Sequence, residues 1–381
     1  MLRLAVVAFI VSAFVGFFTI RWAHLHAHLT ADRRGDGSHK IHKVEVPRVG
    51  GVGIFAGWLA ALVAAVGMGQ MTGLRALTWV GVVSVVFVAG LTEDLTKKVS
   101  PRDRLLAALV SALLGSWFLG ATLNRLDNPA LNLLFVYPLT SMLFTAVAVG
   151  GVAHAVNVID GLNGLAGSIC LMALAALGYV AFHVGDREIT LLALLGIGAL
   201  LGFFIWNYPS GQIFNGDGGA YFLGIYIAML GVLLVNRHDQ VSAWFPLMLM
   251  AYPVWETLFS AFRRHMRGQS SASADTLHLH TLMYRRMPRW ISPSQEANGG
   301  RGLRRNSDAS TLLMILGGAN VIPAVLFWDS TPMLLGAAGL FIVVYFTLYR
   351  RLVRFKMGRR KLPLLAVVAI KTSEAGQTTP Q

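Results

Sequence analysis

The chain has 381 residues, of which 55% are hydrophobic and only 13% are charged. Soluble proteins carry about 25% charged residues, so this composition argues against a water-soluble domain. The formal net charge is +14, and in so apolar a chain the basic residues must gather in short loops. This pattern favours basic loops at an anionic membrane surface over nucleic-acid binding. The single cysteine, Cys170, excludes an intramolecular disulfide framework and a cysteine-based zinc site.

Long apolar runs separated by short polar breaks dominate the sequence. A helix needs about 20 predominantly apolar residues to cross a bilayer, and the runs predict an all-α, polytopic membrane protein of about eleven transmembrane helices. The first run is interpreted as a retained helix, because no small-residue cleavage site follows it and basic residues do. The expected spans cover approximately 2–20, 50–69, 76–91, 105–121, 131–149, 165–184, 189–206, 220–235, 243–262, 311–328 and 333–348.

The basic residues fall unevenly on the two sides of this arrangement. Eleven spans place 27 of the 32 Lys and Arg residues on the side that holds the C-terminus. The positive-inside rule therefore predicts that the N-terminus lies outside and the C-terminus in the cytoplasm. Residues 1–349 are expected to form a single integral membrane domain, in which the cytoplasmic loop 262–309 carries an H-x-H sequence. Residues 350–381 are expected to form a basic cytoplasmic tail that is partly disordered.

Acidic residues occur in cytoplasmic breaks of this apolar protein, although an ionised group near the membrane is costly. Taken singly, each one also suits a solvated helix end, a turn or a helix cap. Two of the breaks contain no Lys or Arg, and a group of carboxylates without basic neighbours predicts a site for Mg²⁺, with Mn²⁺ as an alternative. This pattern favours Mg²⁺-dependent phosphoryl transfer at the cytoplasmic surface. The residues of these breaks are Glu93 and Asp94, then Asn157, Asp160 and Asn163, and then Asp217.

A further polar segment holds the H-x-H sequence formed by His278 and His280, followed by Arg285 and Arg286. Residues two apart share a face of a strand but not of a helix, so this pair is a weak zinc signal. With the adjacent arginines, a pocket for phosphate or a sugar nucleotide is the more natural interpretation. A generic interfacial loop remains the alternative.

Together these segments resemble the motifs of the polyprenyl-phosphate N-acetylhexosamine-1-phosphate transferases, a family of the glycosyltransferase family 4 type. The resemblance extends over most of the chain, from about residue 40 to 286, and five motifs occur in the order of the family. Glu93 stands where the family has the first Asp of a pair, Asn163 stands where it often has Asp, and Asn215 stands where Met is common. The motifs are KIH at 40–42 with PRVGG at 47–51, ED at 93–94 continued by SP at 100–101 and Arg104, NVIDGLNGL at 157–165, FNGDGG at 214–219, and HLH at 278–280.

The resemblance implies an enzyme that transfers a sugar 1-phosphate from a UDP-N-acetylhexosamine to undecaprenyl phosphate and releases UMP. Such an enzyme lies in the bacterial cytoplasmic (inner) membrane, in contact with membrane lipids, with a periplasmic N-terminus and a cytoplasmic active site. No nucleic-acid partner is expected, and a homodimer is left open. A lipid acceptor explains the burial in the bilayer, and a soluble nucleotide donor explains why the motifs face the cytoplasm.

Residue roles follow from the same resemblance. Four acidic residues are implied to be catalytic, with Asp217 as the main Mg²⁺ ligand beside Asp160 and Asn157. The pair at 93–94 is implied to position, and to deprotonate, the lipid phosphate. For polyprenyl phosphate, the expected binding residues are Lys40, His42 and Arg48. For the nucleotide or its diphosphate they are Asn157, Asp160 and Asn163, and for the phosphates or sugar of the donor they are His278, His280 and Arg286. The expected catalytic residues are Glu93, Asp94, Asp160 and Asp217.

Two branches of the family can be weighed. The arginine in PRVGG and the H-x-H resemble the GlcNAc-type branch, which starts cell-surface polysaccharides such as O-antigen or capsule. The phospho-MurNAc-pentapeptide translocase of peptidoglycan synthesis, which usually has Met at the arginine and three histidines, is the alternative. An ion-coupled transporter is a rival of another class, but its acidic residues should lie near the middle of the bilayer, whereas these lie at helix ends on one side. A structural scaffold would leave the acidic cluster unexplained.

Overall fold

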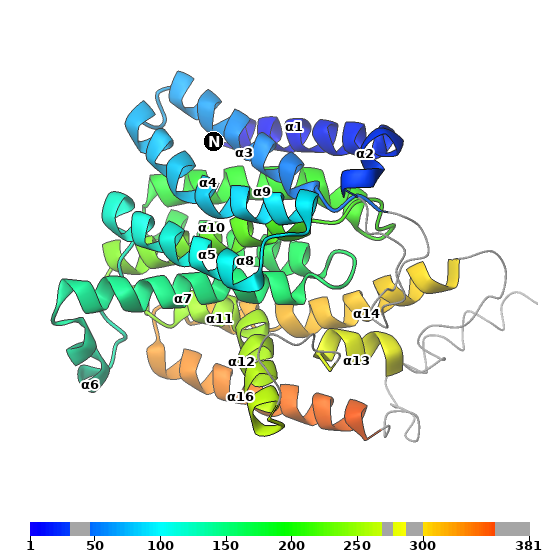
Figure 1. The fold of residues 1–381 in the computed structure, drawn as a ribbon. Helices are drawn as coiled ribbons and strands as arrows, with labels where there is room; N and C mark the ends of the chain where they lie inside the picture. Colours follow the sequence, from blue (N-terminus) through cyan, green and yellow to red (C-terminus); the bar gives the residue numbers. More distant parts are fainter. Residues whose placement is uncertain (31–45, 269–276, 287–299, 355–381) are drawn as a thin grey trace, which may run out of the picture.

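The computed structural model describes residues 1–30, 46–268, 277–286 and 300–354. Within these ranges the regular elements are all helical, and most of them run side by side along the horizontal direction of Figure 1. They are α1 (Leu2–Arg21), α2 (Ala23–Thr30), α3 (Gly50–Gly67), α4 (Gly73–Thr96), α5 (Pro101–Leu114), η1 (Gly115–Leu119), α6 (Pro129–Asn132), η2 (Leu133–Phe135), α7 (Pro138–Ile159), α8 (Leu165–His183), α9 (Arg187–Asn207), α10 (Gly216–Arg237), α11 (Phe245–Leu249), α12 (Ala251–Met266), α13 (Leu279–Arg286), α14 (Gly300–Gly318), α15 (Val321–Leu326) and α16 (Thr331–Val353).

The prediction of an all-α, polytopic membrane protein is confirmed. In the described part of the chain, nine helices are long and apolar enough to cross a membrane. Their outer faces are apolar, as a lipid environment requires. On α1 the exposed large hydrophobic side chains recur every three or four residues and so form one stripe, which consists of Leu2, Val6, Ile10, Phe14 and Phe17.

Four of the eleven expected spans are divided between elements. The span expected at 131–149 covers part of α6, η2 and the first part of α7, and the span expected at 311–328 covers the end of α14 and α15. The segment expected at 105–121 divides into α5 and the π-helical turn η1, and the segment expected at 243–262 divides into α11 and α12. The break lies at Met250, and Pro253 stands in the first turn of α12, where an N–H group would have no partner within that helix. In Figure 1, α12 runs crosswise to the other helices.

The helix α10 forms the centre of the bundle. Every residue from Gly216 to Val235 is buried, and α3, α4, α7 and α8 pack around it. Its sequence is hydrophobic on all sides, which is typical of a helix enclosed by other helices. Trp58 on α3 packs against the rings of Phe222 and Tyr226 at centroid distances of 5.5 and 5.6 Å.

Glycine contacts bring two other helices against the first turn of α10. A Cβ atom on Gly51 of α3 would lie 2.3 Å from the Gly219 nitrogen, and one on Gly90 of α4 would lie 2.6 Å from the Gly218 Cα. The backbones therefore touch directly, which only glycine allows. Gly216 begins the helix with φ +75°, in the left-handed region that favours glycine. These contacts fix the position of the FNGDGG segment relative to α3 and α4.

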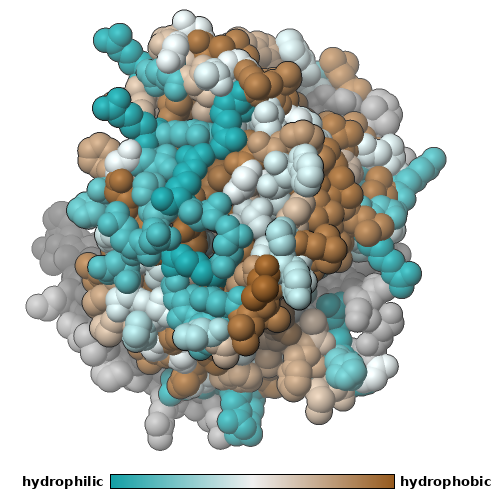
Figure 2. Space-filling view, turned by 90° about the vertical axis from the view of Figure 1, so that its left-hand side faces the viewer, coloured by the Kyte–Doolittle hydropathy of each residue, from teal (hydrophilic) through white to brown (hydrophobic). Residues whose placement is uncertain are grey.

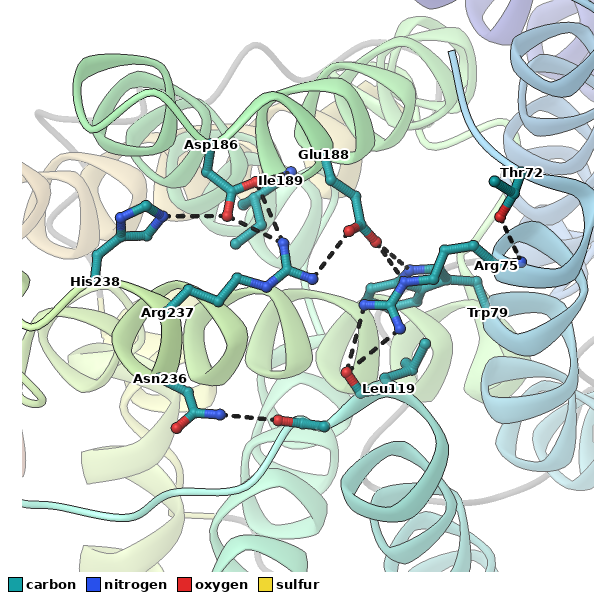
Figure 3. A network of polar contacts seen from close by, with 11 residues as sticks. Thr72, Arg75, Trp79, Leu119, Asp186, Glu188, Ile189, Asn236, Arg237 and His238 are labelled. Carbon is teal, nitrogen blue, oxygen red and sulfur yellow. Dashed lines mark hydrogen bonds and ion pairs between the residues drawn. The ribbon is translucent and has the colours of Figure 1, made fainter. Parts of the chain in front are cut away.

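The opposite end of α10 is held by ion pairs (Figure 3). Arg237 lies 3.0 Å from Asp186 and 2.9 Å from Glu188, and Arg75 of α4 lies 2.7 Å from Glu188. Burial acts to raise the pKa of Asp186, but the Ile189 amide and the Arg237 guanidinium hold that pKa below its usual range. The network thus joins α4, α9 and α10. Figure 2 shows the face at this end of the bundle, where a hydrophilic band is flanked by hydrophobic surface.

We expect Gly90→Ala to lower the thermal unfolding midpoint of the detergent-solubilised protein. The added methyl group would push the backbones of α4 and α10 apart, and overpacking of this kind costs about 1–3 kcal/mol. Gly81→Ala on the same helix is the matched control, because no atom of the described residues lies within 4 Å of its Cβ position. Its gain in helix propensity should leave the midpoint unchanged or slightly higher. Equal midpoints for the two variants would contradict the close packing.

Candidate active site

Asp217 lies in the first turn of α10, at the end of the bundle where the sequence motifs meet. Its Oδ1 accepts a hydrogen bond from Asn157 Nδ2 of α7 at 2.8 Å, and Arg48 Nη2 lies 4.0 Å away. Its Oδ2 forms an ion pair with Arg104 of α5. The carboxylate is almost buried, and the positive end of the α10 dipole stabilises its charge. Three predicted site residues, Arg48, Asn157 and Asp217, are therefore neighbours.

Asp94 caps the N-terminus of α10. Its Oδ1 accepts the Asp217 N–H and its Oδ2 accepts the Gly218 N–H, both at 2.9 Å. The first N–H groups of a helix have no partner within the helix, and here they are shielded from water. The Asp94 side chain is 1% exposed, so it supplies acceptors that solvent cannot. Asp94 thus joins the end of α4 to the residue that the sequence marks as the main metal ligand.

Glu93 faces a different way from its neighbour. Helix α4 continues through Thr96, so adjacent residues on it point in different directions, about 100° apart. The Glu93 Oε2 accepts the Val99 N–H at 2.8 Å and closes the turn that follows α4. Its contacts lie within its own loop, and its assignment as a catalytic residue stays a prediction.

Asp160 follows the last residue of α7 and is half-buried. Among the described residues, no side chain or backbone group forms a hydrogen bond or ion pair with its carboxylate. Burial raises the pKa of Asp160 to about 7; the charge of Arg48 acts in the opposite sense, and that of Asp94 adds to the rise. The Asp160 carboxylate is thus close enough to Arg48 and Asp94 to interact with their charges, and it changes protonation near neutral pH.

The H-x-H residues reach the same loop. A Cβ atom on Gly161 would lie 2.6 Å from Nε2 of His280, so this ring packs against the residue next to Asp160. The rings of His278 and His280 are parallel, with centroids 5.3 Å apart and an interplanar angle of 6°. The structure therefore brings the H-x-H segment next to the loop that holds Asp160, although the two are more than 100 residues apart in the sequence.

Two other predicted residues have structural partners. The Asn163 side chain is 1% exposed and donates to the Pro209 carbonyl, while its backbone N–H donates to Asn306 of α14. Arg286 Nη1 donates to the carbonyls of Leu352 and Val353 at the end of α16. These contacts brace the loops around the site, and substrate contacts by Asn163 and Arg286 stay predictions. Lys40 and His42 lie outside the described residues.

The structure adds three residues that the sequence interpretation did not select for the site. Arg104 pairs with Asp217, and its only signal was its place in the motif that follows the acidic pair. Tyr221, one turn after Asp217, lies under the Arg104 guanidinium at 6.0 Å, and its hydroxyl is 3.0 Å from Nδ1 of His154 on α7. No sequence pattern marked Tyr221 or His154, because a tyrosine or histidine within an apolar run usually belongs to the core.

An apolar cavity of about 580 Å³ begins next to this cluster. It lies between α5, α7, α10, α11 and α12, and His154 and Leu105 line it close to the Arg104 side of the site. Side chains that are exposed on the outer surface also line it, so it opens on the apolar flank of the bundle. These exposed lining residues are Phe144, Val147, Leu247 and Leu258.

The oxygen atoms of the cluster suit a hard divalent cation. In the part of the chain that the structure describes, no three His, Cys, Asp or Glu side chains form an all-protein metal cage. Mg²⁺ needs no such cage, because one or two carboxylates, water molecules and substrate phosphates complete its shell. Asp217 and Asp160 offer carboxylates of this kind, and the Asn157 carboxamide lies beside Asp217.

We expect Asp94→Ala to lower the unfolding midpoint more than Glu93→Ala does. The first change leaves two buried N–H groups of α10 without an acceptor, at about 1–3 kcal/mol for each. The second removes one acceptor from a half-buried turn. Thermal unfolding of both variants in the same detergent measures the difference, and equal losses would contradict the capping arrangement.

Comparison with known proteins agrees with the motifs. A family model described as Glycosyl transferase family 4 matches residues 76–235. A Bacillus subtilis (strain 168) protein, named probable undecaprenyl-phosphate N-acetylglucosaminyl 1-phosphate transferase, is 30% identical over 245 residues, which are 64% of this chain and 67% of that protein. An undecaprenyl-phosphate alpha-N-acetylglucosaminyl 1-phosphate transferase of Thermotoga maritima is 27% identical over 278 residues, which are 73% and 81% of the two chains.

A protein of the alternative branch is also similar. A phospho-N-acetylmuramoyl-pentapeptide-transferase of Clostridium perfringens (strain SM101) is 29% identical over 240 residues, which are 60% of this chain and 72% of that protein. This protein is a weaker match than the two N-acetylglucosaminyl transferases, in agreement with the predicted branch. From these similarities and the order of its motifs, the chain belongs to glycosyl transferase family 4.

Proposed function

We propose that this protein transfers an N-acetylhexosamine 1-phosphate from a UDP-sugar to undecaprenyl phosphate and releases UMP. The single observation that carries the proposal is that the apolar cavity lies next to the acidic cluster. His154 lines the cavity and contacts Tyr221, which lies one helical turn from Asp217. A lipid tail in the cavity would place its phosphate beside Asp217 and Arg104. The names of the Bacillus and Thermotoga relatives support the same acceptor.

The reaction needs two phosphate groups to meet at one place. An oxygen of the lipid phosphate attacks the phosphorus next to the sugar, and the bond from that phosphorus to the UMP oxygen breaks. Arg48 and Arg104 bring positive charge to this point, which reduces the repulsion between the phosphates. Direct in-line displacement fits this geometry better than a covalent intermediate on Asp94. Both oxygens of Asp94 already accept N–H groups of α10, so neither is free to attack the phosphorus. We therefore assign Asp94 to holding Asp217 in place.

The proposal includes a divalent cation, Mg²⁺ or Mn²⁺. Asp217, Asp160 and the carboxamide oxygen of Asn157 would hold it together with water and the substrate phosphates. Such an ion supplies positive charge that stabilises the phosphates as charge shifts during transfer. The ionised form of Asp160 would favour binding of the cation, because a metal ligand must be deprotonated.

The setting of the reaction is part of the proposal. The uneven distribution of Lys and Arg supports a cytoplasmic active site, a periplasmic N-terminus and a cytoplasmic C-terminus in the bacterial inner membrane. The arginine in PRVGG and the H-x-H support the start of a cell-surface polysaccharide, such as O-antigen or capsule, over peptidoglycan synthesis.

The proposal predicts UMP release that requires both undecaprenyl phosphate and a divalent cation. The purified protein in detergent is tested with a panel of UDP-N-acetylhexosamines. Asp217→Asn should reduce the rate by about 100-fold or more, which is typical of losing one electrostatic contact to a transition state. Asp239→Asn, a change at a fully exposed carboxylate at the other end of α10, is the control and should retain the rate.

No UMP release with any donor would contradict the proposed transfer. Ion flux through reconstituted vesicles would then test the transporter, in which the same carboxylates would carry ions.

The cavity makes a separate prediction about the acceptor. Gly151 lines the cavity, and its Cβ position is open. Gly151→Leu should raise KM for the lipid acceptor by about tenfold, which corresponds to ~1.4 kcal/mol, and should leave KM for the UDP-sugar unchanged. Gly81→Leu adds the same side chain on α4, outside the cavity, and is the control. A parallel rise of both KM values in Gly151→Leu would contradict acceptor binding in the cavity.

A further inference from the structure

Glu256 on α12 is a fully buried carboxylate that the transfer proposal does not use. Its side chain is 0% exposed and lies among aromatic residues of α12 and α16. Burying a charged group is costly unless hydrogen bonds compensate for the lost water. The Glu256 Oε1 accepts from Nδ1 of His278 and from the Leu279 N–H, both at 3.0 Å, and the Oε2 accepts from the Tyr345 hydroxyl at 2.8 Å.

These bonds hold the H-x-H segment at two points. The bond to Nδ1 fixes the ring of His278, and the bond to the Leu279 N–H fixes the start of α13. The ring and the backbone are therefore held by the same carboxylate. The same carboxylate is attached to α16 through Tyr345, and α12 and α16 together therefore support the start of α13. His280, parallel to His278, packs on Gly161 beside Asp160. Glu256 thus sets the place of both rings relative to the acidic cluster.

The chemistry of the contact also selects a tautomer. A carboxylate accepts hydrogen bonds and does not donate them, so Nδ1 of His278 must carry the proton. In a neutral ring, Nε2 on the opposite edge is then an acceptor; in a protonated ring, it is a donor to an anion. Supporting residues of this kind orient the groups that meet the substrate, and their loss typically reduces activity by about 10- to 100-fold.

We propose that Glu256 is a positioning residue that holds His278 in the Nδ1–H form and turns its Nε2 edge toward the phosphates of the nucleotide-sugar donor. This inference rests on the proposed transfer for the identity of the donor. The buried contacts of Glu256 with His278 and Leu279 carry it.

A spectroscopic experiment tests the positioning without requiring activity. The ¹⁵N chemical shifts of His278, assigned by comparison with His278→Gln, should show the Nδ1–H form in the native protein. Glu256→Ala should remove that signature, and Glu256→Gln should retain it because its carboxamide oxygen still accepts. An Nε2–H form in the native protein, or an unchanged spectrum in Glu256→Ala, would overturn the proposal.

Kinetics test whether the effect passes through His278. Glu256→Ala should lower kcat/KM by about 10- to 100-fold, mainly by raising KM for the UDP-sugar. The double variant with His278→Ala should be no worse than His278→Ala alone, because residues that act as a unit are not additive. Additive losses would overturn the proposal.

Tyr345→Phe provides the matched control, because it loses a bond to the same carboxylate while the bonds of Glu256 to His278 and Leu279 remain. Its kcat/KM should stay within a few-fold of the native value, and unfolding midpoints identify any variant that fails to fold. A native protein that shows the tautomer but transfers no sugar 1-phosphate would refute the proposed function and leave the positioning intact.

Discussion

The arrangement of the site depends on the capping of α10 by Asp94. The helix begins inside the protein, where water cannot reach its first N–H groups, and one carboxylate from α4 accepts two of them. Glycines at the crossings let α3 and α4 approach closely enough for this contact to form. Asp217 follows directly, so its position is determined by the cap. Arg104, Arg48 and Asn157 from three other parts of the chain then converge on a fixed point.

The two ends of α10 are held by different physical means. At the Asp217 end, backbone N–H groups meet a carboxylate; at the other end, Arg237 bridges Asp186 and Glu188, and Glu188 also binds Arg75. Both arrangements satisfy polar groups that the apolar surroundings cannot. Because α4 takes part at both ends, α4 and α10 form a rigid pair. The cavity and the loops that carry the other motifs are arranged around this pair.

Much of the fold could be predicted from the sequence, since apolar runs of membrane length are a direct consequence of the thickness of the bilayer. A helix start shortly before Pro253 could have been anticipated, because proline is tolerated in the first turn of a helix, but the crosswise course of α12 depends on packing partners that periodicity does not reveal. The motifs located Asp217, Asn157 and Asp160 in one region. The motifs did not indicate the direction of each side chain. Glu93 and Asp94 are adjacent, yet Glu93 closes a turn and Asp94 caps α10. Arg104 and Glu256 act through contacts between distant segments, which a single sequence does not display.

The cavity opens sideways on the flank that carries exposed Phe144, Val147, Leu247 and Leu258. A molecule that enters by this route stays in the hydrocarbon layer, so its encounter with the protein is a two-dimensional diffusion problem. The quantity that governs saturation is then the mole fraction of that molecule among the lipids rather than its concentration in the total volume. Dilution of the vesicles in buffer leaves such an encounter unchanged, whereas dilution of the membrane with inert lipid slows it.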